Sequence, residues 1–242
     1  MKSKKTGKDL EEHIDKAVSK IDKYLHGLAN VHPKKAELIS YWIHDFTKMV
    51  DSEDSFIRAK KRRYKKGDII KVNLGFNIGS EQGGLHYAVV LEKHNPYSHA
   101  TITIAPLTSV DIQSDTKKGT RYGEIHLGTE LYDKLIDKCD SEIENCSKCI
   151  KALDFENIPN CDISEYKETL EKFNRHQKEA KKTLKEIEKM KSGSICLINQ
   201  ITTISKIRIY NPKSNKDVLH GIRLSDKTLD IIDENIRKFF LK

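Results

Sequence analysis

The chain has 242 residues, of which 33% are charged and 37% are hydrophobic. This length allows one large or two modest domains, and the high charged fraction predicts charged helices outside the core. The formal net charge of +8 favours a polyanionic partner. No apolar run approaches membrane-spanning length, and the first residues, MKSKKTGKDLEEH, lack the apolar stretch of a signal peptide. We therefore expect a soluble cytoplasmic protein with no membrane partner.

Two amphipathic helices are predicted within residues 1–60. Apolar residues recur every three or four positions in the first helix, at Leu10, Ile14, Val18, Ile21, Leu25 and Leu28. A second such pattern begins after Pro33 and includes Leu38, Ile39, Trp42, Ile43, Phe46 and Met49. We expect the two helices to pack as a hairpin that buries the first stripe. A partner-binding face is the alternative for that stripe.

A dense basic run, RAKKRRYKK, follows at residues 58–66. Arg62 and Arg63 in this run are suited to neutralise phosphates, and Tyr64 to stack on a base. The alternative is a solvated helix end, whose dipole favours cations. Because the run leads into the first predicted strand, it would lie near any RNA site on that sheet.

Residues 66–110 predict three strands with polar residues at their joints. The strands cover residues 68–75, 86–92 and 101–107, which are rich in β-branched and apolar side chains. Three glycines in GSEQGG, residues 79–84, predict a sharp bend between the first two strands. The third strand delivers Thr108 and Ser109 at its end. This pattern predicts a shallow polar site on a small β-barrel.

The strings GDIIKVNLGFNIGSEQGG, HYAVV and ITIAPLTS resemble the PemK/MazF family of ribonuclease toxins. Residues 194–208, SICLINQITTISKIR, look like the second block of that family. The resemblance implies an SH3-like barrel built from residues 64–130 and 192–242. It also implies metal-independent cleavage of single-stranded RNA such as mRNA, 2′,3′-cyclic phosphate products, a homodimer across the barrel, and a cognate antitoxin that covers the RNA groove. No cofactor is expected.

The resemblance also indicates a catalytic pair. In the family, the arginine of GSEQGG-x-R and the threonine that ends the APLT strand are catalytic; here these positions hold His86 and Thr108, and Tyr87 replaces the usual proline. A guanidinium grips a phosphate but does not readily exchange protons, whereas an imidazole can do so near neutral pH. We therefore predict that His86 is a general acid or base beside Thr108. The alternative is a catalytically inactive RNA-binding or regulatory module.

A different cation must then hold the scissile phosphate, and the candidates are Arg121, Arg208 and the basic run at residues 60–66. Arg208 closes the second block, with a structural salt bridge as its alternative role, and Glu81 is expected mainly to bond the backbone of the glycine loop. The predicted substrate-binding residues are Glu81, Gln82, Ser109, Arg121, Arg208, Arg62, Arg63 and Tyr64.

Residues 131–191 form an insertion between the two blocks. Apolar residues from Ile163 to Ile187 follow a heptad pattern, which predicts a coiled-coil arm that folds back on residues 131–150 or pairs with a second subunit. An assembly protein that works through such arms is a third functional hypothesis. Four cysteines lie here, and a zinc site is the alternative to plain reduced thiols because one pair has CxxC spacing. They are Cys139, Cys146, Cys149 and Cys161.

The C-terminal part predicts a final helix. Ser225 is suited to cap its start, and Leu229, Ile232, Ile236 and Phe239 share one side. The expected fold class is therefore α+β: a small SH3-like barrel with an N-terminal helical hairpin and an inserted helical arm.

Overall fold

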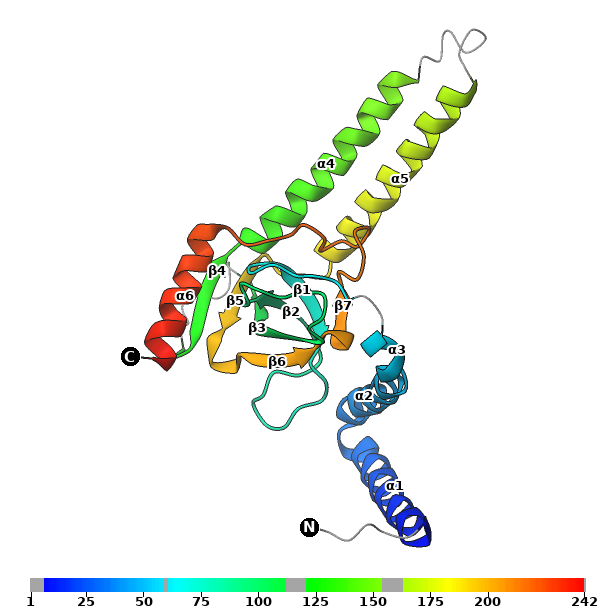
Figure 1. Ribbon diagram of the computed structural model, residues 1–242, viewed down its shortest axis with the longest axis vertical. Helices are drawn as coiled ribbons and strands as arrows, with labels where there is room; N and C mark the ends of the chain where they lie inside the picture. Colours follow the sequence, from blue (N-terminus) through cyan, green and yellow to red (C-terminus); the bar gives the residue numbers. More distant parts are fainter. Residues whose placement is uncertain (1–6, 59–60, 112–120, 154–162, 242) are drawn as a thin grey trace.

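The computed structural model describes residues 7–58, 61–111, 121–153 and 163–241. Its helices are α1 (Gly7–Val31), α2 (Pro33–Asp51), α3 (Glu53–Arg58), α4 (Glu130–Ala152), α5 (Ile163–Ile187) and α6 (Asp226–Phe240). Its strands are β1 (Ile69–Asn73), β2 (Leu85–Val90), β3 (Thr101–Val110), β4 (Glu124–Gly128), β5 (Gly193–Leu197), β6 (Thr202–Ser205) and β7 (Ile209–Asn211), with short 3₁₀ turns η2 (Ile198–Gln200) and η3 (Lys206–Arg208). The predicted α+β class is confirmed (Figure 1). None of the described helices is long and apolar enough to cross a membrane.

The strands form one antiparallel sheet in the order β4-β5-β3-β2-β1-β7, and β6 also pairs with β3. The long strand β3 organises this sheet, because β6 pairs with its first half and β5 with its second half. Among the described residues the strand path ends at β4 and at β7. Closure into an SH3-like barrel therefore stays a prediction.

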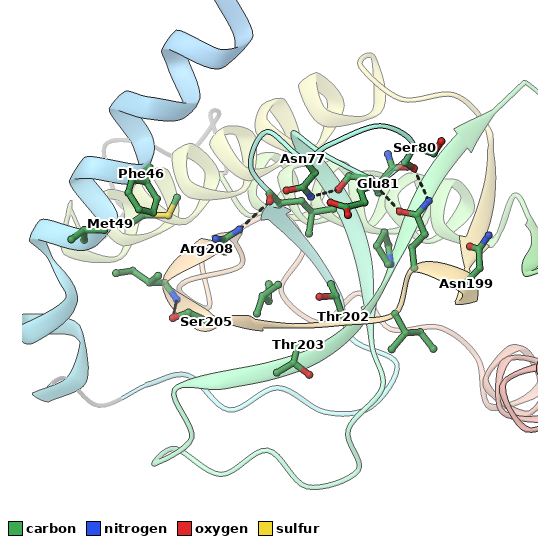
Figure 2. Close-up of a pocket in the computed structure, with 18 of the residues that line it drawn as sticks. Phe46, Met49, Asn77, Ser80, Glu81, Asn199, Thr202, Thr203, Ser205 and Arg208 are labelled. Atoms are coloured by element: carbon green, nitrogen blue, oxygen red, sulfur yellow. Dashed lines mark hydrogen bonds between the residues drawn. The ribbon is translucent and has the colours of Figure 1, made fainter. Parts of the chain in front are cut away.

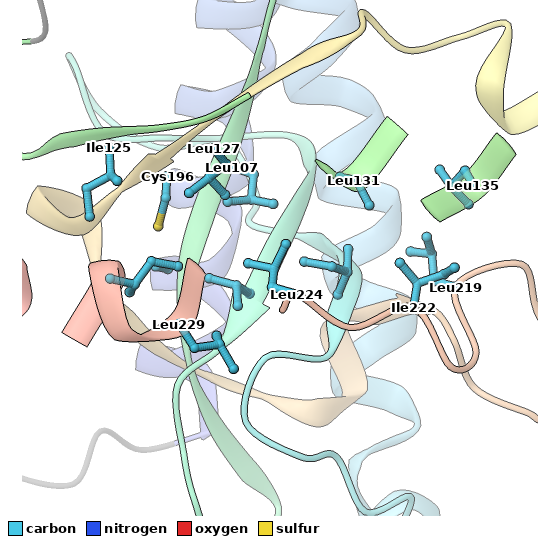
Figure 3. Close-up of a cluster of buried hydrophobic side chains, with 14 of the residues drawn as sticks. Leu107, Ile125, Leu127, Leu131, Leu135, Cys196, Leu219, Ile222, Leu224 and Leu229 are labelled. Atoms are coloured by element: carbon cyan, nitrogen blue, oxygen red, sulfur yellow. The ribbon is translucent and has the colours of Figure 1, made fainter. Parts of the chain in front are cut away.

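Alternating residues of the strands supply two separate cores, since successive side chains point to opposite faces. One face carries a cluster that includes Tyr64, Val72, Ala88 and Ile104. The other face packs against α4, α5 and α6 (Figure 3). We call these the inner cluster and the helix-side cluster. The helix-side cluster contains Ile69, Val89, Leu107, Leu131, Leu135, Cys139, Ile187, Leu229 and Ile232. The base of the predicted insertion therefore belongs to the same core as the strands.

Helices α4 and α5 lie side by side and extend away from the sheet (Figure 1). Cys139 and Cys146 lie seven residues apart on α4, and their thiols donate to the carbonyls of Ala180 and Phe173 at 3.8 and 3.9 Å. His176 Nδ1 lies 2.6 Å from Glu142 Oε2 across the same interface. Of the two arrangements expected for the heptad pattern, the structure adopts the one in which the chain folds back on itself.

The expected burial of the α1 stripe against α2 is wrong for residues 10–21, which are exposed, whereas Leu25 and Leu28 are half-buried. Helix α1 buries none of its residues. Helix α2 instead turns Trp42 toward the loop after β1, where the ring lies against Gly75 and 5.2 Å from the Arg208 guanidinium. Asn73 Nδ2 also donates to Asp45 on α2 at 2.8 Å. Gly75 allows this close approach, because a Cβ at this position would lie only 2.8 Å from the indole.

The C-terminal helix follows the sequence prediction. The Ser225 hydroxyl accepts a hydrogen bond from Thr228 N and so caps α6. Leu229 and Ile232 are buried in the helix-side cluster, and Ile236 and Phe239 pack against it.

Candidate functional site

A cleft of about 830 Å³ lies between α2, the β1–β2 loop and β6 (Figure 2). Phe46 and Met49 of α2 form an apolar wall, and β6 contributes the hydroxyls of Thr202 and Thr203. Arg208 lines the same cleft. The volume lies in the range of small-molecule sites, and the mixture of an aromatic ring, hydroxyls and a guanidinium suits a ligand with both bases and phosphates.

The glycine loop is held at the edge of this cleft by two amide side chains. Gln200 Oε1 accepts from Gln82 N at 2.5 Å, and Gln200 Nε2 donates to Ser80 O at 3.1 Å. Asn77 Nδ2 donates to Gln82 O at 2.8 Å. Glu81, expected to hold the loop, instead has an exposed side chain that lines the cleft. Gln200 was missed, and its only signal was its place in the second block.

Replacing Gln200 with alanine should loosen this loop without unfolding the sheet. Two hydrogen bonds worth about 0.5–1.5 kcal/mol each are lost, so the amide of Gln82 should exchange roughly 5- to 100-fold faster with solvent. Hydrogen exchange read by mass spectrometry would measure this effect. Gln177→Ala, which removes a bond to the exposed Lys181, is the matched control. Unchanged exchange at residues 80–84 would contradict the role given to Gln200.

His86 and Thr108 lie on one face of the sheet. Strands β2 and β3 pair Tyr87 with Leu107, and continuing this antiparallel register by one residue sets His86 opposite Thr108. Residues opposed in this way have Cβ atoms about 4.5–5.5 Å apart. Both side chains are half-buried. The continued register therefore sets an imidazole and a hydroxyl on the same face of adjacent strands.

Gln82 connects this pair to the cleft. Its Nε2 lies 2.8 Å from His86 Nε2 and 3.1 Å from His86 Nδ1. His86 Nδ1 also lies 3.4 Å from Leu107 O. Gln82 also lines the cleft. The amide therefore orients the imidazole at the edge of the cavity.

The end of β3 differs from the expectation. The strand continues to Val110, because β5 pairs Ile195 with Thr108 and Ser194 with Ser109. Thr108 and Ser109 therefore lie within the strand rather than at its end. As adjacent strand residues they point to opposite faces, so Ser109 lies on the other side of the sheet from His86.

Arg208 is the predicted cation that the fold brings to the cleft. Its Nη1 donates to Leu74 O at 3.0 Å, and its guanidinium stacks on Trp42. Arg208 thus contacts a backbone carbonyl and an aromatic ring, rather than the carboxylate expected for the alternative role in a structural salt bridge. A guanidinium has five N–H donors, so a bond to one carbonyl leaves donors for an anionic ligand.

The basic run lies elsewhere. Tyr64 is only 4% exposed and belongs to the inner cluster, and its hydroxyl donates to Pro212 O at 2.9 Å. Burial raises the pKa of Tyr64. The expectation that this ring stacks on a base is therefore wrong, because the ring fills the core. Arg62 donates to Asn215 Oδ1 at 2.9 Å, and neither it nor the exposed Arg63 and Arg121 is among the described residues that line the cleft.

The cysteines for which a zinc site was the alternative lie away from the cleft. Cys139, Cys146 and Cys149 are on α4, and Cys161 lies outside the described residues. Burial raises the pKa of the Cys139 and Cys146 thiols, which favours their neutral form against the carbonyls of α5. Within the described ranges, no group of three or more His, Cys, Asp or Glu side chains could hold a metal ion.

The described residues thus define an α+β protein whose antiparallel sheet carries a polar cleft, and Gln82 in the wall of this cleft contacts the His86 imidazole. Residues 65–138 match the family model of the PemK-like, MazF-like toxin of type II toxin-antitoxin systems. This segment includes β1 to β4 and the start of α4, and with them His86 and Thr108. The match agrees with the resemblance of the motifs within this segment. None of the curated proteins searched matches the chain.

Proposed function

We propose that the protein is the toxin of a type II toxin–antitoxin pair and cleaves single-stranded RNA without a metal ion. The observation that carries this proposal is that Gln82, which lines the polar cleft, contacts the His86 imidazole on the strand next to the one that holds Thr108. The family match over residues 65–138 supports it. A cytoplasmic location, a homodimer and an antitoxin that covers the RNA groove belong to the same proposal.

The proposed chemistry uses the 2′-hydroxyl of the substrate as the nucleophile. As it attacks the adjacent phosphorus, the P–O5′ bond breaks and a 2′,3′-cyclic phosphate forms. The His86 imidazole takes the 2′-proton or gives a proton to the departing 5′-oxygen, and water performs the other proton transfer, so that the leaving fragment ends in a 5′-hydroxyl. The Thr108 hydroxyl donates to a non-bridging phosphate oxygen, where negative charge grows in the transition state. Gln82 keeps the imidazole in position.

The cleft is proposed to hold the RNA on either side of the scissile phosphate. Arg208 offers a cation, and Thr202 and Thr203 offer hydroxyls. Phe46 is 49% exposed on the opposite wall and provides a face on which a base can stack. The apolar wall comes from α2, outside the matched segment, so substrate preference is expected to depend on this helix.

Incubation of the purified protein with a defined single-stranded RNA in EDTA tests this function. We expect cleavage to fragments ending in 2′,3′-cyclic phosphate, identified by mass spectrometry. The same oligonucleotide with a 2′-deoxy residue at the cleaved position should stay intact, because the nucleophile is missing. Cleavage of both oligonucleotides, or of neither, would overturn the proposal.

A catalytically inactive RNA-binding module is the second candidate. It is favoured by the replacement of the family arginine by His86, and by the engagement of Arg208 with Leu74 O and Trp42. Fluorescence anisotropy with the same labelled RNA separates the two candidates. Binding that falls with salt, together with intact RNA after long incubation, would support the inactive module.

A further inference from the structure

Helix α1 presents an apolar stripe that the described chain leaves open. Leu10, Ile14 and Ile21 are each 49% exposed, and Val18 is 60% exposed. Leu25 and Leu28, nearer to α2, are half-buried. Large apolar side chains gathered on one helix face are typical of an interface, whereas scattered ones are normal on a surface. The open part of the stripe therefore covers residues 10–21.

The spacing of this stripe is that of a coiled coil. Leu10, Ala17 and Tyr24 are seven residues apart, and so are Ile14, Ile21 and Leu28. The two series interleave at three and four residues, which gives the a and d positions of a heptad repeat. A helix with such a seam buries it best against another helix with the same repeat.

The charges of α1 are divided between its two halves. Residues 8–15 contain one lysine and four acids, whereas residues 16–23 contain three lysines and one acid. Two copies in parallel would set like charges beside each other. Two antiparallel copies set the acidic half of each beside the basic half of the other, which favours association and fixes its direction.

We propose that α1 pairs with α1 of a second copy of this chain as an antiparallel coiled coil. The two-fold axis lies between Asp15 and Lys16. In this register Leu10 packs against Ile21 of the partner, and Ile14 packs against Ala17 of the partner. The contact uses the open residues 10–21 and leaves Leu25 and Leu28 to α2. It is independent of the RNA chemistry and of any dimer through the sheet.

Cysteine cross-linking of the full chain tests both the contact and its direction. Leu10→Cys and Ile21→Cys variants are mixed and oxidised at low concentration, and linked peptides are identified by mass spectrometry, which separates them from links through the native cysteines. We expect the 10–21 peptide to exceed the 10–10 peptide at least tenfold. A dominant 10–10 peptide would mean that the two helices are parallel. If neither cross-linked peptide forms, the stripe has another occupant. Both results overturn the proposal.

A stripe variant provides the second measurement. Ile14→Asp, added to both cysteine variants, should reduce the 10–21 peptide at least tenfold, because it sets a carboxylate in the apolar seam. Helix α1 buries no residue in the single chain, so the variant should fold normally, as circular dichroism would verify. Ser19→Asp on the polar face is the matched control and should leave the yield unchanged. Equal yields with Ile14→Asp would also overturn the proposal.

Discussion

Replacing His86 with alanine is expected to lower the rate of RNA cleavage about 10²–10⁴-fold, the usual loss when a general acid or base is removed. Single-turnover rates on a defined RNA would measure this loss. Binding of the RNA should change much less, because the cleft keeps Arg208 and the β6 hydroxyls. The expected signature is therefore a fall in rate with little change in affinity.

Two further variants sharpen this test. Thr108→Ala should cost about 10²–10³-fold in rate, the effect of losing one donor to a developing negative charge. His94→Ala removes an exposed imidazole beyond β2 and should leave the rate unchanged. If His86→Ala cleaves as fast as His94→Ala, the imidazole at position 86 takes no part in the chemistry. If both wild type and His86→Ala are inert, the inactive module gains instead.

The second large effect is expected at Glu186, where α5 meets the sheet. The Lys71 ammonium and the Tyr87 hydroxyl both donate to its carboxylate, and Lys71 also lies over the Tyr87 ring. The Lys71 and Glu186 side chains are only 16% and 17% exposed. Glu186→Ala leaves the buried Lys71 ammonium without a carboxylate partner. It should lower the free energy of unfolding by about 3–5 kcal/mol, as measured by denaturant titration.

The matched control is an exposed pair of the same type. Glu168→Ala removes a carboxylate that pairs with Lys172 on the solvent side of α5, and it should change the stability very little. Equal effects of the two replacements on the free energy of unfolding would show that burial of the Lys71–Glu186 pair does not increase its contribution to stability.

The same carboxylate predicts a pH dependence. Burial raises the pKa of Glu186, but the hydrogen bonds from Lys71 and Tyr87 outweigh it and bring the pKa below its usual value. A carboxyl whose pKa is lower in the folded than in the unfolded chain stabilises the fold. This stabilisation is fully present above the pKa in the unfolded chain, about 4.3, and is lost as the pH falls through the pKa in the folded chain. The stability difference between wild type and Glu186→Gln should therefore shrink on acidification from pH 7. A difference that stays constant with pH would contradict this linkage.

Local pattern was sufficient for much of the fold and for part of the site. The β-branched runs and the glycine loop predicted β1 to β3, and periodicity predicted α1, α2, α5 and α6, because these features depend on neighbours within one turn or one strand. His86 and Thr108 lie 22 positions apart in the chain, so the motifs that contain them could also be recognised from the sequence. Ser225 as the cap of α6 is a local feature of the same kind.

Long-range packing decided the rest. Tyr64 stands in a basic run that suits RNA, yet its ring lies in the inner cluster, since only the folded sheet provides a cavity of that shape. Gln200 reaches the glycine loop across more than 100 residues of chain. The sequence by itself determined that α1 is amphipathic. Only the tertiary structure decided that residues 10–21 of the stripe stay open, because no other described element covers them, and that Trp42 of α2 packs on Gly75.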